Sequence, residues 1–158
     1  DVYPNIWCHG DFIKISEHGG MVMYGRSDTT LNPGGVRIGT SEIYRQIEQM
    51  EEIEDSVVVS QNWKNDVRVI LFVKLPDRVE LTEELKQKIV SNIRSNISPR
   101  HVPAKILSVP DIPYTLNMKK VELAVKKIIE NQPVLNKDAL INPEALDFYA
   151  GLKELQEG

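Results

Sequence analysis

The sequence has little cysteine and no excess of basic residues. A single cysteine, Cys8, excludes an internal disulfide, and one thiol without clustered His or Cys residues does not make a metal site. We therefore expect a reducing, cytosolic environment. The formal net charge of -4 argues against a general nucleic-acid binder, because such surfaces need a basic excess to displace counterions.

A long hydrophobic segment is also missing. No continuous apolar run reaches the ~18 residues that a membrane-spanning helix needs, and the opening DVYPNIWCHGDF does not resemble a signal peptide. We expect no membrane insertion. Because no initiator methionine is present, we interpret residue 1 as a position inside a longer protein. The 158 residues, 41% of them hydrophobic, suffice for one large domain or one domain with an attached segment.

The first part of the chain predicts short strands and then a helix. Glycines punctuate residues 1–35 and separate short apolar pieces, which favours a β-hairpin region with tight turns. Apolar residues at helical spacing follow, with Thr40 or Ser41 as the expected N-cap. This pattern predicts a helix of about three turns.

The central part predicts a sheet covered by helices. Two β-branched runs, 56–63 and 67–75, favour an antiparallel hairpin. A helix over 83–97, capped by Thr82, and a short strand over 104–110 follow. With a third helix after it, the order βαββαβα predicts an α+β sandwich with an antiparallel sheet.

Two lysines, Lys119 and Lys120, are expected at the start of this third helix, with Asn117 as its N-cap. A cation there is unfavourable by roughly 0.3–1 kcal/mol, and a solvated lysine pair is the simplest interpretation. The position also suits an anion, because lysine charge and a helix N-terminus act together on a phosphate or carboxylate. Position alone does not decide between the two interpretations.

A second cluster, GRSDTTLNPGGVRIG at 25–39, combines glycines with arginines. By itself the Pro-Gly-Gly at 33–35 is an ordinary turn, and Arg26 with Asp28 is a surface pair worth under about 1 kcal/mol. Alternatively, Arg26 and Arg37 would hold a phosphate-bearing ligand on a loop that lets it approach the backbone. No G-x-x-x-x-G-K-[ST] pattern occurs, so the loop is not a Walker P-loop.

Three segments in order resemble late motifs of the adenylate-forming (acyl-CoA synthetase) superfamily. They are WCHGDF at 7–12, GRSDTTLNPGGVRIGTSEIY at 25–44 and IPYTLNMKKVE at 112–122. Within the superfamily, RHVP at 100–103 and NPEALDFY at 142–149 make the resemblance greatest to its acetoacetyl-CoA synthetase branch. The resemblance covers essentially the whole chain.

The resemblance implies a division of the chain and an activity. Residues 1–27 would end a large N-terminal AMP-binding domain, residues 28–130 would form the C-terminal domain, and residues 131–158 would be a docked extension. The implied reaction converts acetoacetate, ATP and coenzyme A to acetoacetyl-CoA, AMP and diphosphate through an acyl-adenylate. Mg²⁺ would be bound mainly by the N-terminal domain, which is the expected protein partner and carries the acid pocket, so the chain alone is expected to be inactive.

The alternatives are an acetyl- or propionyl-CoA synthetase-like enzyme and a non-catalytic regulatory homologue.

The resemblance also implies residue roles. Lys119 would be the catalytic lysine, which neutralises charge developing at the α-phosphate of ATP. Asp28 would be the hinge about which the C-terminal domain swings between the two half-reactions. The implied ligand contacts are Asp11, Arg26 and Arg37 for ATP or AMP, and Gly34, Gly35 and Arg94 for coenzyme A, with Arg100 as the alternative to Arg94.

Two residues depart from the family pattern. His9 replaces a threonine, and Met118 replaces the glycine that precedes the lysine. Glycine allows a backbone geometry or close approach that methionine opposes, so Met118 bears on the placement of the lysine. Lys120 is a rival for the catalytic role, although the motif register favours Lys119.

Overall fold

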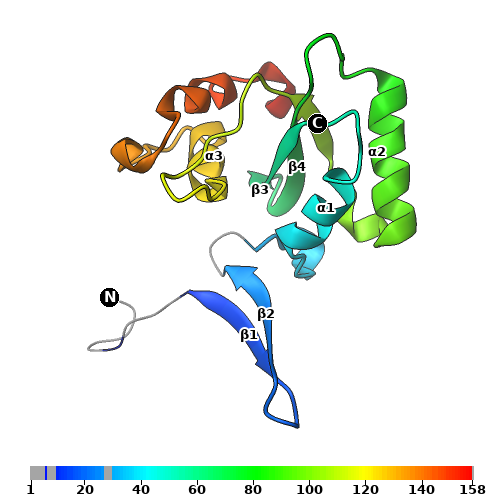
Figure 1. Ribbon diagram of the computed structural model, residues 1–158, viewed down its shortest axis with the longest axis vertical. Coiled ribbons are helices and arrows are strands. Elements are labelled where there is room, and N and C mark those ends of the chain that lie inside the picture. Colours follow the sequence, from blue (N-terminus) through cyan, green and yellow to red (C-terminus); the bar gives the residue numbers. More distant parts are fainter. Residues whose placement is uncertain (1–5, 7–9, 27–29, 158) are drawn as a thin grey trace.

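A computed structural model describes residue 6, residues 10–26 and residues 30–157 of the chain, without the side chains of Phe12 and residues 24–26 (Figure 1). Strands β1 (Asp11–Ile15) and β2 (Met21–Arg26) form an antiparallel hairpin. This hairpin agrees with the β-hairpin region predicted from the glycine spacing. His9 and Asp28 lie outside the described residues.

A three-stranded sheet in the order β3-β4-β5 forms the centre of the rest. Strands β3 (Asp55–Trp63) and β4 (Asp66–Lys74) are antiparallel, as predicted. Lys64 and Asn65 join them with φ values of 47° and 65°. Positive φ at both residues of a two-residue turn matches the right-handed twist of the strands, which explains the tight connection.

The prediction of a wholly antiparallel sheet is wrong, because β5 (Lys105–Ser108) pairs parallel with β4. Helix α2 (Glu83–Asn96) lies between these strands in the sequence and acts as a crossover connection, which returns the chain to run in the same direction. The predicted α+β class is confirmed, with a mixed sheet.

One face of the sheet is covered by α1 (Thr40–Ile47) and α2 (Figure 1). Alternate strand residues point to this side, as the period of two in a β-strand requires. The buried cluster includes Val58, Leu71 and Val73 from the strands with Ile43, Ile47, Leu85, Ile89 and Ile93 from the helices.

The opposite face is covered by α3 (Glu122–Ile129) and the C-terminal segment, drawn from yellow to red in Figure 1. Three short 3₁₀ helices make up that segment: η3 (Lys137–Ala139), η4 (Pro143–Tyr149) and η5 (Lys153–Leu155). The Tyr149 ring meets Phe72 edge-on at 4.8 Å between ring centroids. Because both faces are covered, β3 and β4 are each buried at consecutive residues and not only at alternate ones.

The end of the chain is held by Arg68, a buried residue of β4. Its Nη2 donates to the Leu155 carbonyl at 2.7 Å and its Nη1 to the Glu157 carbonyl at 3.1 Å. The guanidinium lies 3.8 Å from the ring centroid of Trp63, and burial lowers the pKa of Arg68. Arg68 therefore fastens the last turn of the chain to the sheet.

Helix starts differ from the sequence prediction in two places. Gly39 is the N-cap of α1, so neither Thr40 nor Ser41 caps it, and the helix has 8 residues, about two turns. Helix α3 begins at Glu122 with Val121 as its N-cap. The predicted Thr82 cap of α2 is confirmed, since its side chain accepts a hydrogen bond from Leu85 N.

Candidate active site

Lys119 lies in a tight turn and not at the start of a helix, contrary to the sequence prediction. The Met118 N–H donates to the Thr115 carbonyl at 2.9 Å, and the Thr115 N–H donates to the Lys119 carbonyl at 2.9 Å. The Thr115 hydroxyl oxygen accepts from the Lys119 N–H at 3.1 Å. These bonds use backbone groups that a helix would have needed, which is why α3 starts later. Residues 114–120 are called the lysine turn below.

Met118 has a φ of 57°, in the left-handed region that glycine adopts most readily. The bond from the Met118 N–H to the Thr115 carbonyl closes a four-residue turn whose last residue is left-handed. A residue with a Cβ is disfavoured there by roughly 1–2 kcal/mol. The Met118 side chain is 69% exposed, so it meets no steric obstacle. Methionine thus takes the conformation expected of glycine, and Lys119 keeps its place in the turn.

The two lysines have different surroundings. Lys120 Nζ lies 2.8 Å from Asp55 Oδ1 and 4.4 Å from the ring centroid of Tyr44, with its side chain 18% exposed. Lys119 is exposed, and no ion pair joins it to a described residue. Of these two lysines, Lys119 is therefore the one whose ammonium group is both exposed and outside an ion pair.

The cluster around Lys120 joins four segments of the chain. The Tyr114 hydroxyl donates to Asp55 Oδ2 at 2.7 Å. The Tyr44 hydroxyl donates to Glu122 Oε1 at 2.6 Å and accepts from the Val58 N–H at 3.0 Å. These bonds connect the lysine turn, α1, β3 and α3. The sequence prediction missed this network, since no local pattern distinguishes its members.

The tyrosines of this cluster stay protonated at neutral pH. Burial, followed by the charge of Glu122, raises the pKa of Tyr44 well above its ordinary value. Burial also raises the pKa of Tyr114, and its hydrogen bond to Asp55 adds to the shift. Both hydroxyls therefore remain hydrogen-bond donors to their carboxylates.

The glycine-rich loop is closed by a backbone bridge between Leu31 and Ile38, both buried. Gly34 and Gly35 have φ values of 57° and 75°, and a Cβ at either would meet nothing within 4 Å. The Gly34 N–H lies 3.2 Å from each carboxylate oxygen of Asp66. We call residues 31–38 the glycine loop. The contact of Asp66 with this loop was not predicted from the sequence.

The other predicted site residues are not all brought together. Asp11 and Arg26 are register partners at the open end of the β1–β2 hairpin, which places their backbones side by side. Arg37 lies exposed at the end of the glycine loop, and Arg94 lies exposed in the last turn of α2. No hydrogen bond or ion pair links the described atoms of Arg94 with the glycine loop.

His101 connects the RHVP segment to α1. Its Nε2 lies 2.7 Å from Glu42 Oε2, and its Nδ1 lies 2.9 Å from the Ser98 hydroxyl oxygen. This contact joins the segment after α2 to the first turn of the helix that follows the glycine loop.

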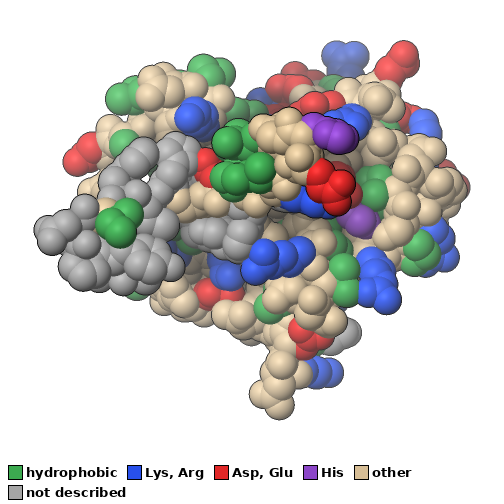
Figure 2. Space-filling view, turned by 90° about the horizontal axis from the view of Figure 1, so that it is seen from below, with side chains coloured by type: hydrophobic (Ala, Val, Ile, Leu, Met, Phe, Trp, Pro, Cys, Tyr) green, Lys and Arg blue, Asp and Glu red, His purple; other side chains and the backbone are tan. Residues whose placement is uncertain are grey.

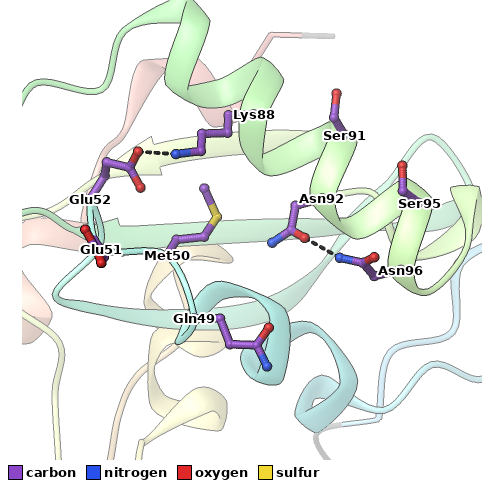
Figure 3. A pocket seen from close by; sticks show the side chains of 9 residues that line it. All are labelled: Gln49, Met50, Glu51, Glu52, Lys88, Ser91, Asn92, Ser95 and Asn96. Atoms are coloured by element: carbon purple, nitrogen blue, oxygen red, sulfur yellow. Dashed lines mark hydrogen bonds and ion pairs between the residues drawn. The ribbon is translucent and has the colours of Figure 1, made fainter.

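A groove of about 650 Å³ lies between the end of α1 and α2 (Figure 3). Four of its polar side chains pair with one another, Lys88 with Glu52 and Asn92 with Asn96. It is separate from both the lysine turn and the glycine loop in its lining residues. The face in Figure 2 carries acidic and basic side chains interspersed, without one continuous basic patch.

The described part of the chain contains neither a membrane-spanning helix nor a cluster of metal ligands. Among these residues, none of the helices combines the length and the apolar character needed to cross a membrane. Nor do the described His, Cys, Asp and Glu side chains form a group of three or more that could hold a metal ion.

Comparison with known proteins supports the motif resemblance. No protein-family profile matches the chain. The chain is 59% identical over 156 residues to an acetoacetyl-coenzyme A synthetase of Rhizobium meliloti (strain 1021), which covers 99% of the chain and 24% of the relative. It is 51% identical to an acetoacetyl-CoA synthetase of Xenopus tropicalis, over 98% of the chain and 23% of the relative.

Solved structures give the same result. The acetoacetyl-CoA synthetase of Streptomyces lividans matches with a TM-score of 0.83 and 37% identity, over 99% of the chain and 24% of that protein. An acyl-CoA synthetase of Brucella canis, 24% identical, matches 82% of the chain and 25% of that protein with a TM-score of 0.63, which shows a shared fold. The resemblance predicted from the motifs is confirmed, and the chain spans about a quarter of the length of these relatives.

Proposed function

We propose that this chain is the C-terminal part of an acetoacetyl-CoA synthetase, an acid–thiol ligase. The whole enzyme would join acetoacetate to coenzyme A at the expense of ATP. The proposal rests on the exposed Lys119 ammonium, presented by a tight turn beside a lysine that is already paired. The similarity to acetoacetyl-CoA synthetases over nearly the whole chain supports the choice of acid.

In the first half-reaction, an acetoacetate carboxylate oxygen attacks the α-phosphorus of ATP and diphosphate leaves. Negative charge grows on the α-phosphate oxygens, and a fixed cation stabilises it. Lys119 is the residue that we assign to this role. Asp11 and Arg26, at the open end of the β1–β2 hairpin, are proposed to contact the ribose, and Arg37 the nucleotide.

In the second half-reaction, the coenzyme A thiolate attacks the adenylate carbonyl carbon and AMP leaves. Gly34 and Gly35 leave open space where side chains would stand, which suits the passage of the narrow pantetheine arm. Arg94 is proposed to meet the phosphates of coenzyme A. Presenting the lysine turn and the glycine loop in succession requires the domain to swing, with Asp28 as the proposed hinge.

Mg²⁺ is expected to accompany ATP in such an enzyme. The described residues of this chain offer no suitable cluster of metal ligands. We therefore propose that the ion is held mainly by the N-terminal domain. A cytosolic location also remains a proposal, which the single cysteine supports.

Met118, in place of the family's glycine, is the feature that favours the non-catalytic alternative. Its φ of 57° is a conformation that glycine also adopts, which supports the catalytic proposal over that alternative.

Separate measurement of the half-reactions in the full-length protein tests the proposal. Lys119→Ala should reduce ATP–diphosphate exchange by about 10²-fold or more, as loss of a charge-stabilising group does. It should leave thioester formation from supplied acetoacetyl-adenylate largely intact. Lys153→Ala, which removes another exposed lysine, is the matched control. Unchanged exchange in Lys119→Ala would refute the assignment, and a substrate panel with acetate and propionate would test the choice of acid.

A further inference from the structure

The Asp55 carboxylate contacts both arms of the lysine turn. Tyr114 and Lys120 are antiparallel bridge partners at the base of the turn. The Tyr114 hydroxyl donates to Asp55 Oδ2 at 2.7 Å, and Lys120 Nζ lies 2.8 Å from Asp55 Oδ1. One carboxylate therefore binds one residue from each arm, with a separate oxygen for each.

Asp55 is itself firmly placed. It is the first residue of β3, whose next residues are buried in the sheet, and its Oδ1 also accepts from the Ser56 N–H at 2.7 Å. The Asp55 and Lys120 side chains are 21% and 18% exposed. Partial burial reduces screening by water and makes such a charge-assisted contact stronger than an exposed surface pair.

The two arms of the lysine turn differ in their other support. Thr115, on the first arm, forms a bridge with Leu140, and the Leu116 N–H donates to the Ala139 carbonyl at 3.1 Å. The second arm carries Lys119, and its neighbour Lys120 is held by Asp55, by the Tyr44 ring and by Glu48 Oε1 at 3.8 Å. Of these groups only Asp55 also holds the first arm.

We propose that Asp55 is a positioning residue for Lys119, acting through Lys120 and Tyr114. This inference rests on the proposed function, because it assumes that Lys119 carries charge to the α-phosphate. Asp55 does not touch the substrate. It fixes the direction in which the turn presents the Lys119 ammonium, and a displacement of about 1 Å at a reacting centre can reduce a rate about 10²-fold.

The kinetic test uses the full-length protein with Asp55→Ala. The kcat for ATP–diphosphate exchange should fall about 10- to 100-fold, while the KM values for ATP and acetoacetate change by less than about two-fold. Thioester formation from supplied acetoacetyl-adenylate should remain near the wild-type rate. Asp55→Asn should recover part of the exchange rate, because its amide oxygen still accepts one hydrogen bond.

Two further variants separate the contact of Asp55 with Lys120 from its contact with Tyr114. Lys120→Met and Tyr114→Phe each remove one contact of Asp55, and each should lower exchange less than Asp55→Ala does. Glu83→Gln is the control, since Glu83 forms a highly exposed pair with Lys86 in the first turn of α2. It should leave both half-reactions unchanged.

A readout without catalysis distinguishes this inference from the proposed function. Hydrogen exchange at the Met118 and Lys119 amides should be faster in Asp55→Ala than in wild type, whatever reaction the protein performs. Three results in Asp55→Ala would each overturn the positioning role. They are unchanged hydrogen exchange at these amides, an unchanged adenylation rate, and an equal loss of rate in both half-reactions. Retained adenylation in Lys119→Ala would instead refute the proposed function.

Discussion

The lysine turn and the glycine loop are built in opposite ways. The lysine turn contains Met118 in a left-handed conformation, and the side chains of Tyr114 and Lys120 anchor it to Asp55 in β3. The glycine loop has two left-handed glycines, and its Gly34 N–H is held by one carboxylate. A segment that presents a charge must fix the direction of a side chain. A segment that admits a ligand must instead keep side chains away.

The largest expected effect comes from adding a side chain to the glycine loop. Gly35→Val should slow thioester formation about 10²-fold in the full-length protein, because the isopropyl group occupies the proposed path of pantetheine. Adenylation should change much less. Gly151→Val is the matched control, since Gly151 also has a positive φ of 67° with open space at its Cβ position. Equal effects of both variants on thioester formation would show that strain alone is responsible.

Removing a hydroxyl from the network behind the lysine turn should have the next largest effect. Tyr44→Phe removes the hydroxyl that donates to Glu122 Oε1 and accepts from the Val58 N–H, and should lower the free energy of unfolding by about 1–3 kcal/mol. Urea unfolding measures it. Tyr149→Phe, which loses one bond to the Asp111 carbonyl, should cost less. If Tyr44→Phe lowered the free energy of unfolding less than Tyr149→Phe does, the importance assigned to this network would be contradicted.

The same tyrosine predicts a pH dependence. Because burial raises the pKa of Tyr44 above its ordinary value of 10.0, the unfolded chain loses this proton at lower pH than the folded chain does. Its contribution to stability is therefore complete below pH 10 and is lost as the pH rises toward the folded pKa. Urea midpoints measured across this range should fall more steeply for wild type than for Tyr44→Phe. Parallel curves would contradict the assignment.

A smaller effect is expected at the Asp66 carboxylate, which faces the Gly34 N–H of the glycine loop. Asp66→Asn removes the charge facing the Gly34 N–H and should lower the free energy of opening of the loop by about 1 kcal/mol. Faster hydrogen exchange at the Gly34 amide would reveal it. Asp77→Asn serves as a surface control. No change at Gly34 would mean that the loop is held by its backbone bridge alone.

The smallest effect is expected from restoring glycine in the lysine turn. Met118→Gly relieves left-handed strain but adds freedom to the unfolded chain, so a net stabilisation of about 0.5 kcal/mol is expected from thermal unfolding. ATP–diphosphate exchange should be kept. Asn131→Gly is the matched control, since Asn131 has a φ of 56° and asparagine tolerates this conformation better. A large gain in exchange would show that Met118 displaces Lys119.

Elements set by neighbouring residues were predicted well. The Thr82 cap depends on residues a few positions apart, and so does the hairpin of two β-branched strands joined at residues 64–65. The direction of β5 was not predictable in this way, because it depends on the path of α2 between two strands. The position of Lys119 was predicted as the start of a helix, since the turn-forming role of the Thr115 side chain leaves no periodic pattern.

The network around Lys120 was out of reach of local patterns for a related reason. The Tyr44–Glu122 bond joins residues 78 positions apart, and the Tyr114–Asp55 bond joins residues 59 positions apart. Each residue alone resembles an ordinary surface or helix residue. The motif resemblance identified Lys119, whereas only the fold identified the groups that hold its turn.

The cover on the second face of the sheet has a consequence for biosynthesis. Strands β3 and β4 are translated before α3 and the C-terminal segment that bury Phe72, including Tyr149 and Leu155. Until residues 122–155 have left the ribosome, this apolar face lacks part of the cover that α3 and the C-terminal segment provide, and such faces are prone to aggregation. The Arg68 contacts with the Leu155 and Glu157 carbonyls can form only after that. A nascent chain that stops before Leu155 would therefore expose part of this face.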